Sequence, residues 1–321
     1  MTVMVERIRK DSPMKGVKYI ALGHNVSEAG QAAQYSTRNS SWLKNTFSDG
    51  IMETGKTRRL RRIFRDDHKT VIIPMDHSVS AGPTHGLEDM ARIVGDVSQG
   101  EADAILVHAG IAKTVDMNRL GLILHLSGAT RLSADPHWKT QVSTVKEALR
   151  LGADAVSVHI NVGSQREQDM LDRFSRIIEE CDDFGLPALA MMYPRGPGIQ
   201  SEGDYEVVSH AARLGFEIGA DIVQTNYTGD IESFRNVVGT VKVPVVIAGG
   251  PKASSDNDAL QMISDSIKAG AAGVSIGRNV FQHHDPTRMT RALVDIVHHG
   301  ASASQALAIL AEGTAPSMAA T

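Results

Sequence analysis

The fold can be read from the stretch Leu151-Gly152-Ala153-Asp154-Ala155-Val156-Ser157-Val158-His159. In this stretch, a glycine that can end a helix is followed by a short apolar run. Glycine serves there because, without a Cβ, it adopts positive φ at little cost. Similar junctions occur at Ile218-Gly219-Ala220-Asp221 and at Ala269-Gly270-Ala271-Ala272. They indicate one repeated unit, in which a helix leads into a strand.

Short apolar runs recur along the chain from residue 71 onward, and helical patterns lie between most of them. Such runs are typical of parallel strands that are buried on both faces. Eight units of strand and helix predict an α/β protein with a closed (β/α)8 TIM barrel. The predicted strands are Val71–Met75, Ala104–His108, Leu122–Leu126, Ala155–His159, Ala188–Met192, Ile222–Thr225, Val243–Ala248 and Gly273–Ile276.

The length of 321 residues fits one such barrel with additions, because α/β barrels reach about 250 residues as a single domain. We predict an N-terminal extension over residues 1–55, the barrel over 56–312 and a flexible tail over 313–321. The basic stretch Lys56–Arg65 suggests phosphate or nucleic-acid binding. Its apolar spacing favours instead a solvated helix with Leu60, Ile63 and Phe64 facing inward.

Composition narrows the class of partner. Hydrophobic residues make up 42% and charged residues 22% of the chain, as in ordinary globular proteins with a large core. The net charge of -4 provides no basic field, which argues against nucleic acid or an anionic membrane as the partner. The N-terminus lacks the apolar core of a signal peptide, so we expect a cytoplasmic protein. The lone cysteine, Cys181, excludes an internal disulfide and is expected to be a small apolar helix residue.

Barrel enzymes carry their active sites at the C-terminal ends of the strands, so the residues that close each apolar run are the candidates. Those positions are polar in this chain. They are occupied by Asp76, His77, His108, His159, Tyr193, Arg195 and Gln224. Arg195 can hold a hydroxyl or carboxylate with two hydrogen bonds, or can simply shape its loop. We assign His77, His159 and Arg195 to substrate binding. His77, His108 and His159 are also candidates for a metal site, although histidines at strand ends more often satisfy local hydrogen bonds.

The turns after the last two strands predict a phosphate site. Glycines there let backbone N–H groups approach an anion, the following helix adds its positive end, and two cations add charge. The alternative is a pair of tight turns with solvated cations. We assign the substrate phosphate to Gly249, Gly250, Lys252, Gly277 and Arg278.

Five motifs occur in the chain in a family order: Pro74-Met75-Asp76-His77, Val158-His159-Ile160-Asn161-Val162-Gly163-Ser164, Tyr193-Pro194-Arg195-Gly196, Thr225-Asn226-Tyr227-Thr228-Gly229-Asp230 and Ala248-Gly249-Gly250-Pro251-Lys252. With them the chain resembles the DeoC/FbaB aldolase superfamily over roughly 55–300 by the usual size of a domain. It is most similar to the archaeal-type class I fructose-bisphosphate aldolases and the 2-amino-3,7-dideoxyheptulosonate (ADH) synthase branch.

The resemblance implies a lyase or synthase that acts on a sugar phosphate, without a metal or cofactor, and it implies a homo-oligomer. Asp76 and Tyr193 match the acid–base pair of the family, and we expect crowding to raise the pKa of Asp76. A structural role is the alternative for both residues. Gln224 stands where the family carries its Schiff-base lysine, and Ala109 stands where related sequences often have another lysine.

An amide nitrogen is not a nucleophilic amine, so Gln224 cannot form the imine. Three hypotheses follow. The first is an aldolase reaction in which Lys252 or Lys113 replaces the amine, or in which hydrogen-bond donors polarise the carbonyl. The second is isomerisation, enolisation or elimination that uses Asp76 and Tyr193. The third is a non-catalytic sugar-phosphate binder, and the sequence is compatible with either a natural glutamine or an engineered inactive variant.

Overall fold

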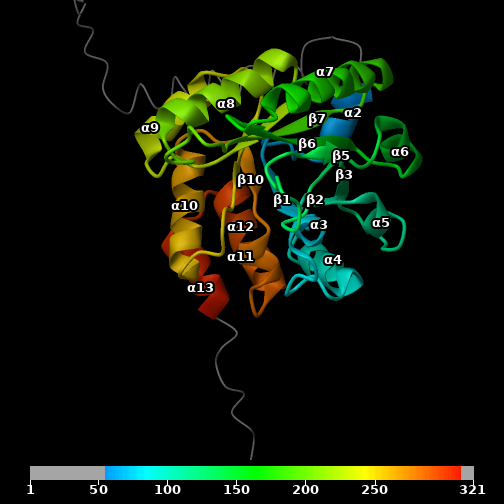
Figure 1. Ribbon diagram of the computed structural model, residues 1–321. Helices are drawn as coiled ribbons and strands as arrows, with labels where there is room; N and C mark the ends of the chain where they lie inside the picture. Colours follow the sequence, from blue (N-terminus) through cyan, green and yellow to red (C-terminus); the bar gives the residue numbers. More distant parts are fainter. Residues whose placement is uncertain (1–54, 312–321) are drawn as a thin grey trace, which may run out of the picture.

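The computed structural model describes residues 55–311 of the chain. Within them, eight parallel strands close into a barrel in the order β1-β10-β9-β8-β7-β6-β3-β2. Helices surround this barrel (Figure 1). The predicted (β/α)8 barrel is confirmed. The predicted extension, apart from Gly55, and the predicted tail lie outside the described residues.

The barrel strands agree with the eight predicted apolar runs, with ends that differ by a few residues. Strand β6 is longer than predicted and continues to Val162, which carries Asn161 into the sheet. The barrel strands are β1 (Thr70–Pro74), β2 (Ala104–Val107), β3 (Gly121–His125), β6 (Ala155–Val162), β7 (Ala188–Pro194), β8 (Ile222–Thr225), β9 (Val245–Ala248) and β10 (Gly273–Ser275).

Most of the long helices connect successive strands, and hydrogen-bonding caps begin several of them. Asp230, for example, accepts hydrogen bonds from the backbone N–H groups of Glu232 and Ser233 at the start of α9. The helices are α2 (Gly55–Leu60), α3 (His77–Ala81), α4 (Met90–Gln99), α5 (Ala109–Ala112), α6 (Val145–Arg150), α7 (Glu167–Phe184), α8 (Tyr205–Ile218), α9 (Ile231–Gly239), α10 (Asp256–Lys268), α11 (Arg278–Phe281), α12 (Pro286–His299) and α13 (Ala303–Ala311).

One feature is absent from the prediction, a small antiparallel pair of strands after β3. Strand β4 (Ser127–Gly128) pairs with β5 (Thr140–Gln141). Residues 129–139 form a loop between these two strands, and α6 follows β5. These strands have only two residues each, so they produce no hydrophobic period that a sequence pattern could reveal. They hold the loop beside the C-terminal end of the barrel.

The basic stretch folds as predicted in its burial but not in its length. Helix α2 ends at Leu60, and a hydrogen-bonded turn carries the chain onward to β1. Leu60, Ile63 and Phe64 are buried against side chains of the barrel interior, among them Ile72 and Leu106. They close the bottom of the barrel with apolar surface.

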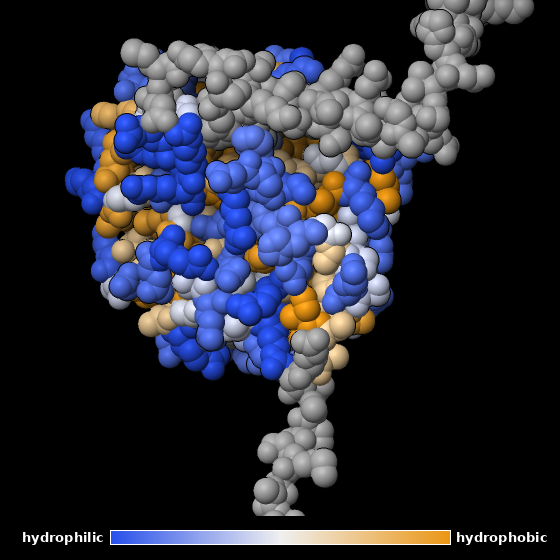
Figure 2. Space-filling model, turned by 180° about the vertical axis from the view of Figure 1, so that it is seen from behind, coloured by the Kyte–Doolittle hydropathy of each residue, from blue (hydrophilic) through white to orange (hydrophobic). Residues whose placement is uncertain are grey.

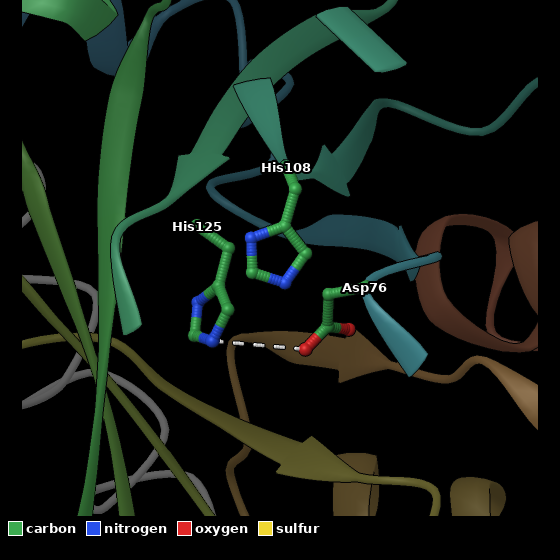
Figure 3. A group of neighbouring side chains, drawn as sticks. All are labelled: Asp76, His108 and His125. Carbon is green, nitrogen blue, oxygen red and sulfur yellow. Dashed lines mark ion pairs between the residues drawn. The ribbon is translucent and has the colours of Figure 1, made fainter. Parts of the chain in front are cut away.

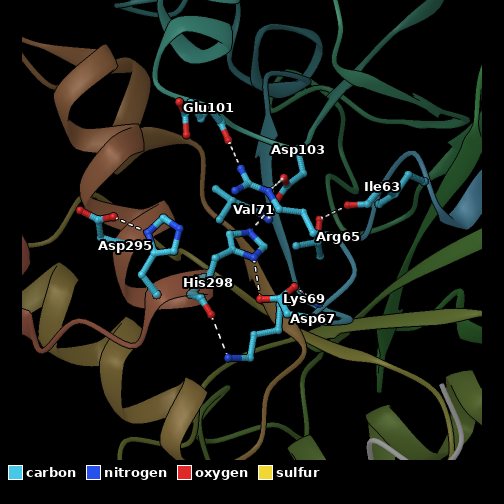
Figure 4. Close-up of polar contacts among 12 residues, drawn as sticks. Ile63, Arg65, Asp67, Lys69, Val71, Glu101, Asp103, Asp295 and His298 are labelled. Carbon is cyan, nitrogen blue, oxygen red and sulfur yellow. Dashed lines mark hydrogen bonds and ion pairs between the residues drawn. The ribbon is translucent and has the colours of Figure 1, made fainter. Parts of the chain in front are cut away.

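A polar network joins the same end of the barrel to α12 (Figure 4). The carboxylate of Asp103 accepts a hydrogen bond from the backbone N–H of Val71 at 2.7 Å and from Nε of Arg65 at 2.5 Å. His298 of α12 contacts Asp103 through Nε2 and Asp67 through Nδ1, both at 2.9 Å. The network therefore fixes α12 to β1 and to the start of β2.

The outer surface is largely polar. Figure 2 shows hydrophilic residues over most of one face, with smaller hydrophobic patches between them. Cys181 lies buried on the inner side of α7, as predicted for a small apolar residue, and burial raises the pKa of its thiol to about 12. Among the helices of residues 55–311, none combines the length and the apolar character needed to cross a bilayer.

Candidate active site

A cavity of about 430 Å³ opens at the C-terminal ends of the strands. It lies where barrel enzymes place their chemistry. Most of the predicted site residues line this one cavity. They are Asp76, His77, His108, His159, Tyr193, Arg195, Gln224, Gly249, Gly250, Gly277 and Arg278.

A second hollow, of about 550 Å³, lies at the opposite end of the molecule. Its wall includes Gly55, Leu149, Asp154, two arginines of α2 and the two arginines that follow it. Active sites of this fold form at the C-terminal ends of the strands. The cavity there contains the carboxylate of Asp76 and several imidazoles, which can transfer protons. The cavity at the C-terminal strand ends is therefore the candidate active site.

Tyr193 and Gln224 come together because of the register of β7 and β8. Met191 pairs with Gln224, and side chains along a strand alternate, so Tyr193 also points into the barrel. Nε2 of Gln224 donates a hydrogen bond to the phenol oxygen of Tyr193 at 2.7 Å. Both side chains are buried, with exposed fractions of 2% and 7%.

This hydrogen bond defines what the phenol can do. Burial raises the pKa of Tyr193, and the nearby Arg195 opposes this only in part. The phenol therefore keeps its proton at neutral pH. Since the oxygen accepts from Gln224, the O–H is left to donate elsewhere. Oε1 of Gln224 is buried and has no hydrogen-bond partner among the described residues, so it can accept a hydrogen bond from a ligand.

Asp76 lies two residues beyond β1, where the chain turns into α3. Three imidazoles lie around its carboxylate, and Figure 3 shows two of them, those of His108 and His125. Nε2 of His125 lies 3.7 Å from Oδ2, and Nδ1 of His77 lies 3.6 Å from Oδ1. The ring of His108 packs edge-on against that of His125, with 5.1 Å between their centroids.

The prediction that the pKa of Asp76 is raised is wrong. Burial alone raises this pKa, but the neighbouring His125, His77 and His108 more than offset it, and the pKa is lowered. Asp76 therefore rests as a carboxylate at neutral pH. It is suited to begin a reaction as a base and to act as an acid only after it has taken a proton.

His125 was passed over in the sequence, although it is the last residue of β3. It is 3% exposed, and burial lowers its pKa to about 4. Its Nδ1 lies 2.7 Å from Oγ of Ser157, which fixes the ring and leaves Nε2 toward Asp76. A reading that ended the strand at His125 rather than at Leu126 would have found it.

The predicted imidazole group is corrected by the same geometry. His108 approaches His125 and Asp76, whereas His159 packs against Tyr193 at 4.9 Å between centroids and has its Nε2 2.8 Å from Oδ1 of Asn161. The ligand atoms of Asp76, His108 and His125 all lie within 4.8 Å of one another. These three residues, rather than the predicted three histidines, are the group that can hold a divalent metal ion.

The glycine turns after β9 and β10 line the cavity on the side of Arg278. The guanidinium donates to the carbonyl of Gly250 at 2.7 Å, which holds the cation at the turn. The backbone N–H groups of Gly250 and Gly277 donate to none of the described residues. Gly277 is followed by α11, a single short turn of helix, so the anion is expected to be held by amides and the cation more than by a helix end.

Lys252 and Lys113 lie outside the cavity wall. Nζ of Lys252 donates to the carbonyl of Gln282 at 2.8 Å, on the side of a neighbouring pocket. Nζ of Lys113 pairs with the carboxylate of Glu147 at 2.7 Å. Both predicted substitutes for the missing amine are therefore displaced from the site.

Lys139 is a cavity residue that the sequence did not single out. It precedes β5, in a loop that has no strand motif, and tertiary contacts, among them the pairing of β4 with β5, hold it at the barrel mouth. Burial and the neighbouring Arg195 lower its pKa, while Asp76 opposes the shift. The wall thus holds the cations Lys139, Arg195 and Arg278 against one carboxylate, that of Asp76, among its described residues.

Four buried polar atoms on this wall have no hydrogen-bond partner among the described residues. They are Nδ1 of His77, Oε1 of Gln224, Oγ of Ser275 and Nε of Arg278. A buried polar group left without a partner costs about 1–3 kcal/mol. Their gathering in one cationic cavity is typical of a site that is completed by a polar, anionic ligand or by water.

The fold and the site together define an aldolase-like barrel, with a half-buried carboxylate, a buried phenol and glycine turns at the C-terminal strand ends. Residues 70–283 match the family model of the DeoC/LacD family aldolases. This match covers more than half of the chain, and the chain belongs to that family. It is an aldolase-type lyase or synthase.

The chain is similar to named synthases over most of its length. It is 46% identical over 260 residues to a 2-amino-3,7-dideoxy-D-threo-hept-6-ulosonate synthase of Halobacterium salinarum, covering 80% of this chain and 97% of the relative. It is 40% identical over 254 residues to a 2-amino-4,5-dihydroxy-6-oxo-7-(phosphonooxy)heptanoate synthase of Streptomyces griseus, covering 78% and 93%.

A similar solved structure is an archaeal fructose-1,6-bisphosphate aldolase with its catalytic lysine bound covalently to a carbinolamine intermediate of the substrate. It is 33% identical, with a TM-score of 0.72, and the alignment covers 75% of this chain and 99% of that chain. In that relative a lysine amine reacts with the substrate.

Proposed function

We propose that this protein makes or breaks a carbon–carbon bond in a phosphorylated ketose or an amino-deoxy sugar phosphate. The observation that carries the proposal is the cavity wall, where a half-buried carboxylate and a buried phenol face a cationic glycine-turn pocket. The names of the similar synthases and aldolase, which concern phosphorylated or deoxy sugars, support this substrate class.

The substrate phosphate is proposed to lie against Gly249, Gly250, Gly277 and Arg278. Two of these glycines offer backbone N–H groups without a described partner, and the guanidinium adds positive charge. His77, His159 and Arg195 line the same cavity and are proposed to bind the hydroxyl groups of the sugar. Arg195 is oriented by its ion pair with Glu202 at 2.8 Å.

Asp76 is proposed to accept the proton of a hydroxyl group. This hydroxyl group is carried by one of the two carbons whose bond breaks. Its lowered pKa supports this role, because the carboxylate is free of a proton when the reaction begins. Tyr193 is proposed to donate its hydrogen bond to the oxygen of the reacting carbonyl. Its raised pKa keeps the phenol protonated, so it supports charge there as a donor.

The test is cleavage of a panel of phosphorylated ketoses, followed by the release of the ketone phosphate and the aldehyde. We expect Asp76→Asn to lower kcat/KM about 10²- to 10⁴-fold, as for the loss of a general base. The control is Asp183→Asn, which removes an exposed carboxylate of α7 and should leave the rate unchanged.

Two outcomes would contradict the proposal. Deuterium exchange next to the carbonyl without cleavage would favour an enolising or isomerising enzyme that uses the same two residues. Tight binding of the panel without turnover in either direction would favour a non-catalytic sugar-phosphate binder.

A further inference from the structure

We propose that Lys139 supplies the reactive amine of this site and forms the covalent imine with the substrate ketone that Gln224 cannot form. The inference rests on the proposed function and adds a catalytic residue to it. Among the described residues of the cavity wall, Lys139 is the only lysine. It lines the same cavity as Asp76, Tyr193 and Gln224.

The backbone around Lys139 is held in place, although the segment is a loop. Nη1 of Arg173, from α7, donates to the carbonyl of Lys139 at 3.0 Å. Nδ2 of Asn161, from β6, donates to the carbonyl of His137 at 2.6 Å. The next residue, Thr140, pairs with Gly128 in the small sheet. Three elements thus fix the base of the lysine side chain at the barrel mouth.

The amine of Lys139 is not held by a carboxylate of any described residue. Lys56 and Lys113 are held by carboxylates at 2.8 Å and 2.7 Å, whereas Nζ of Lys139 has no hydrogen bond or ion pair with a described residue. Its positive charge lowers the pKa values of His125 and His159, which line the same cavity.

Its environment favours the neutral form that attacks a carbonyl. Burial and the adjacent guanidinium of Arg195 both lower the pKa of Lys139. Desolvation and a neighbouring cation are the two means by which proteins make a lysine nucleophilic. Asp76 opposes the shift without cancelling it.

The step balances without a cofactor. Neutral Nζ attacks the carbonyl carbon, and the C–N bond forms as the π bond of the carbonyl breaks. The resulting carbinolamine loses its oxygen as water and takes up one proton overall, which leaves a protonated imine. This cation accepts the electron pair of the carbon–carbon bond as that bond breaks. Oε1 of Gln224, which has no described partner, is available to accept the carbinolamine hydroxyl.

A lysine in a cationic wall also has a simpler role, which is to attract the anionic groups of the substrate. In that case the loss of Lys139 would weaken binding without affecting any covalent intermediate. The two roles therefore differ in a covalent readout rather than in activity alone.

The test traps the imine in the full-length protein. Dihydroxyacetone phosphate is added as the probe, sodium borohydride reduces any imine, and peptide mass spectrometry locates the adduct. We expect one adduct on Lys139, with its yield rising with pH as the ammonium loses its proton. Lys139→Met should remove the adduct, and Lys113→Met, which removes an exposed lysine outside the cavity, should retain it.

A positive control shows that the probe enters the cavity. Gln224→Lys restores an amine at the position that the family resemblance marks, and the adduct should then form at residue 224. If that variant is labelled while the wild type is not, Lys139 forms no imine and the inference is overturned. Labelling of the wild type on another lysine has the same consequence.

The inference and the proposed function can fail separately. Cleavage that persists in the wild type without any adduct leaves the function intact and rejects Lys139 as the amine. If that cleavage is also abolished by a chelator, the group Asp76, His108 and His125 would polarise the carbonyl through a metal ion instead. An adduct on Lys139 without any cleavage supports the amine and rejects the lyase reaction.

Discussion

At the scale of single residues, Gln224 and Tyr193 form the pair on which the site depends. The amide nitrogen donates to the phenol oxygen at 2.7 Å in a buried position. A sequence shows that residue 224 is a glutamine and that no amine can come from it. It does not show what the amide contacts, because residues 193 and 224 meet only through the register of β7 and β8.

We predict that Tyr193→Phe lowers the free energy of unfolding by about 1–3 kcal/mol, since Nε2 of Gln224 then has no acceptor. The double variant Tyr193→Phe with Gln224→Met should recover much of that loss, because the stranded amide is gone. Urea unfolding at neutral pH measures both values. Strict additivity of the two single changes would show that the hydrogen bond contributes nothing.

The other residues of the site were not equally predictable from the sequence. Asp76 and Tyr193 could be found from strand ends and from the family motifs. His125 and Lys139 were missed, because the first lies inside an apolar run whose end was predicted one residue too late and the second lies in a loop without a motif. The lowered pKa of Asp76 was also unpredictable, since it depends on three imidazoles of which only that of His77 is a neighbour in the sequence.

At the scale of elements, the barrel depends on the close approach of β1 and β10. Gly273 begins β10 at φ 146°, and a Cβ built there would lie 2.0 Å from the carbonyl oxygen of Thr70. Thr70 and Gly273 are paired in register where the barrel closes. A glycine is required at this position both for the backbone conformation and for the space.

Gly273→Ala is therefore expected to destabilise the protein by several times more than a change at an open glycine. The matched control is Gly152→Ala, which has φ 73° and no atom within 4 Å of the added Cβ. Left-handed backbone alone costs a non-glycine residue about 1–2 kcal/mol. Denaturant unfolding compares the two, and equal losses would show that the approach to Thr70 is relieved by small shifts.

At the scale of the whole molecule, the cavity makes stability depend on pH. His125 is buried, and its pKa is lowered to about 4 from the usual 6.5. The pKa values of His159, His108 and His77 are also lowered, with burial as the largest cause. These groups stay neutral in the folded protein, while in the unfolded chain they take up protons.

The unfolding free energy should consequently fall as the pH drops from about 6.5 toward 4, because the unfolded state binds more protons in that range. The shift of His125 alone corresponds to about 3 kcal/mol at most. His125→Gln should flatten the dependence, and His210→Gln, at an exposed position of α8, should not. Urea titrations at several pH values provide the measurement, and an unchanged slope in His125→Gln would contradict the prediction.

The sequence by itself determined the eight strands, the polar residues that follow them and the absence of an amine at residue 224. These are local properties, because strand period, helix-ending glycines and the chemistry of one side chain do not depend on distant residues. Only the tertiary structure decided that His125 contacts Asp76, that Gln224 contacts Tyr193 and that Lys139 lines the cavity. Those contacts depend on how the barrel closes and on where the pair β4 and β5 places the loop between them. No local sequence pattern encodes either feature.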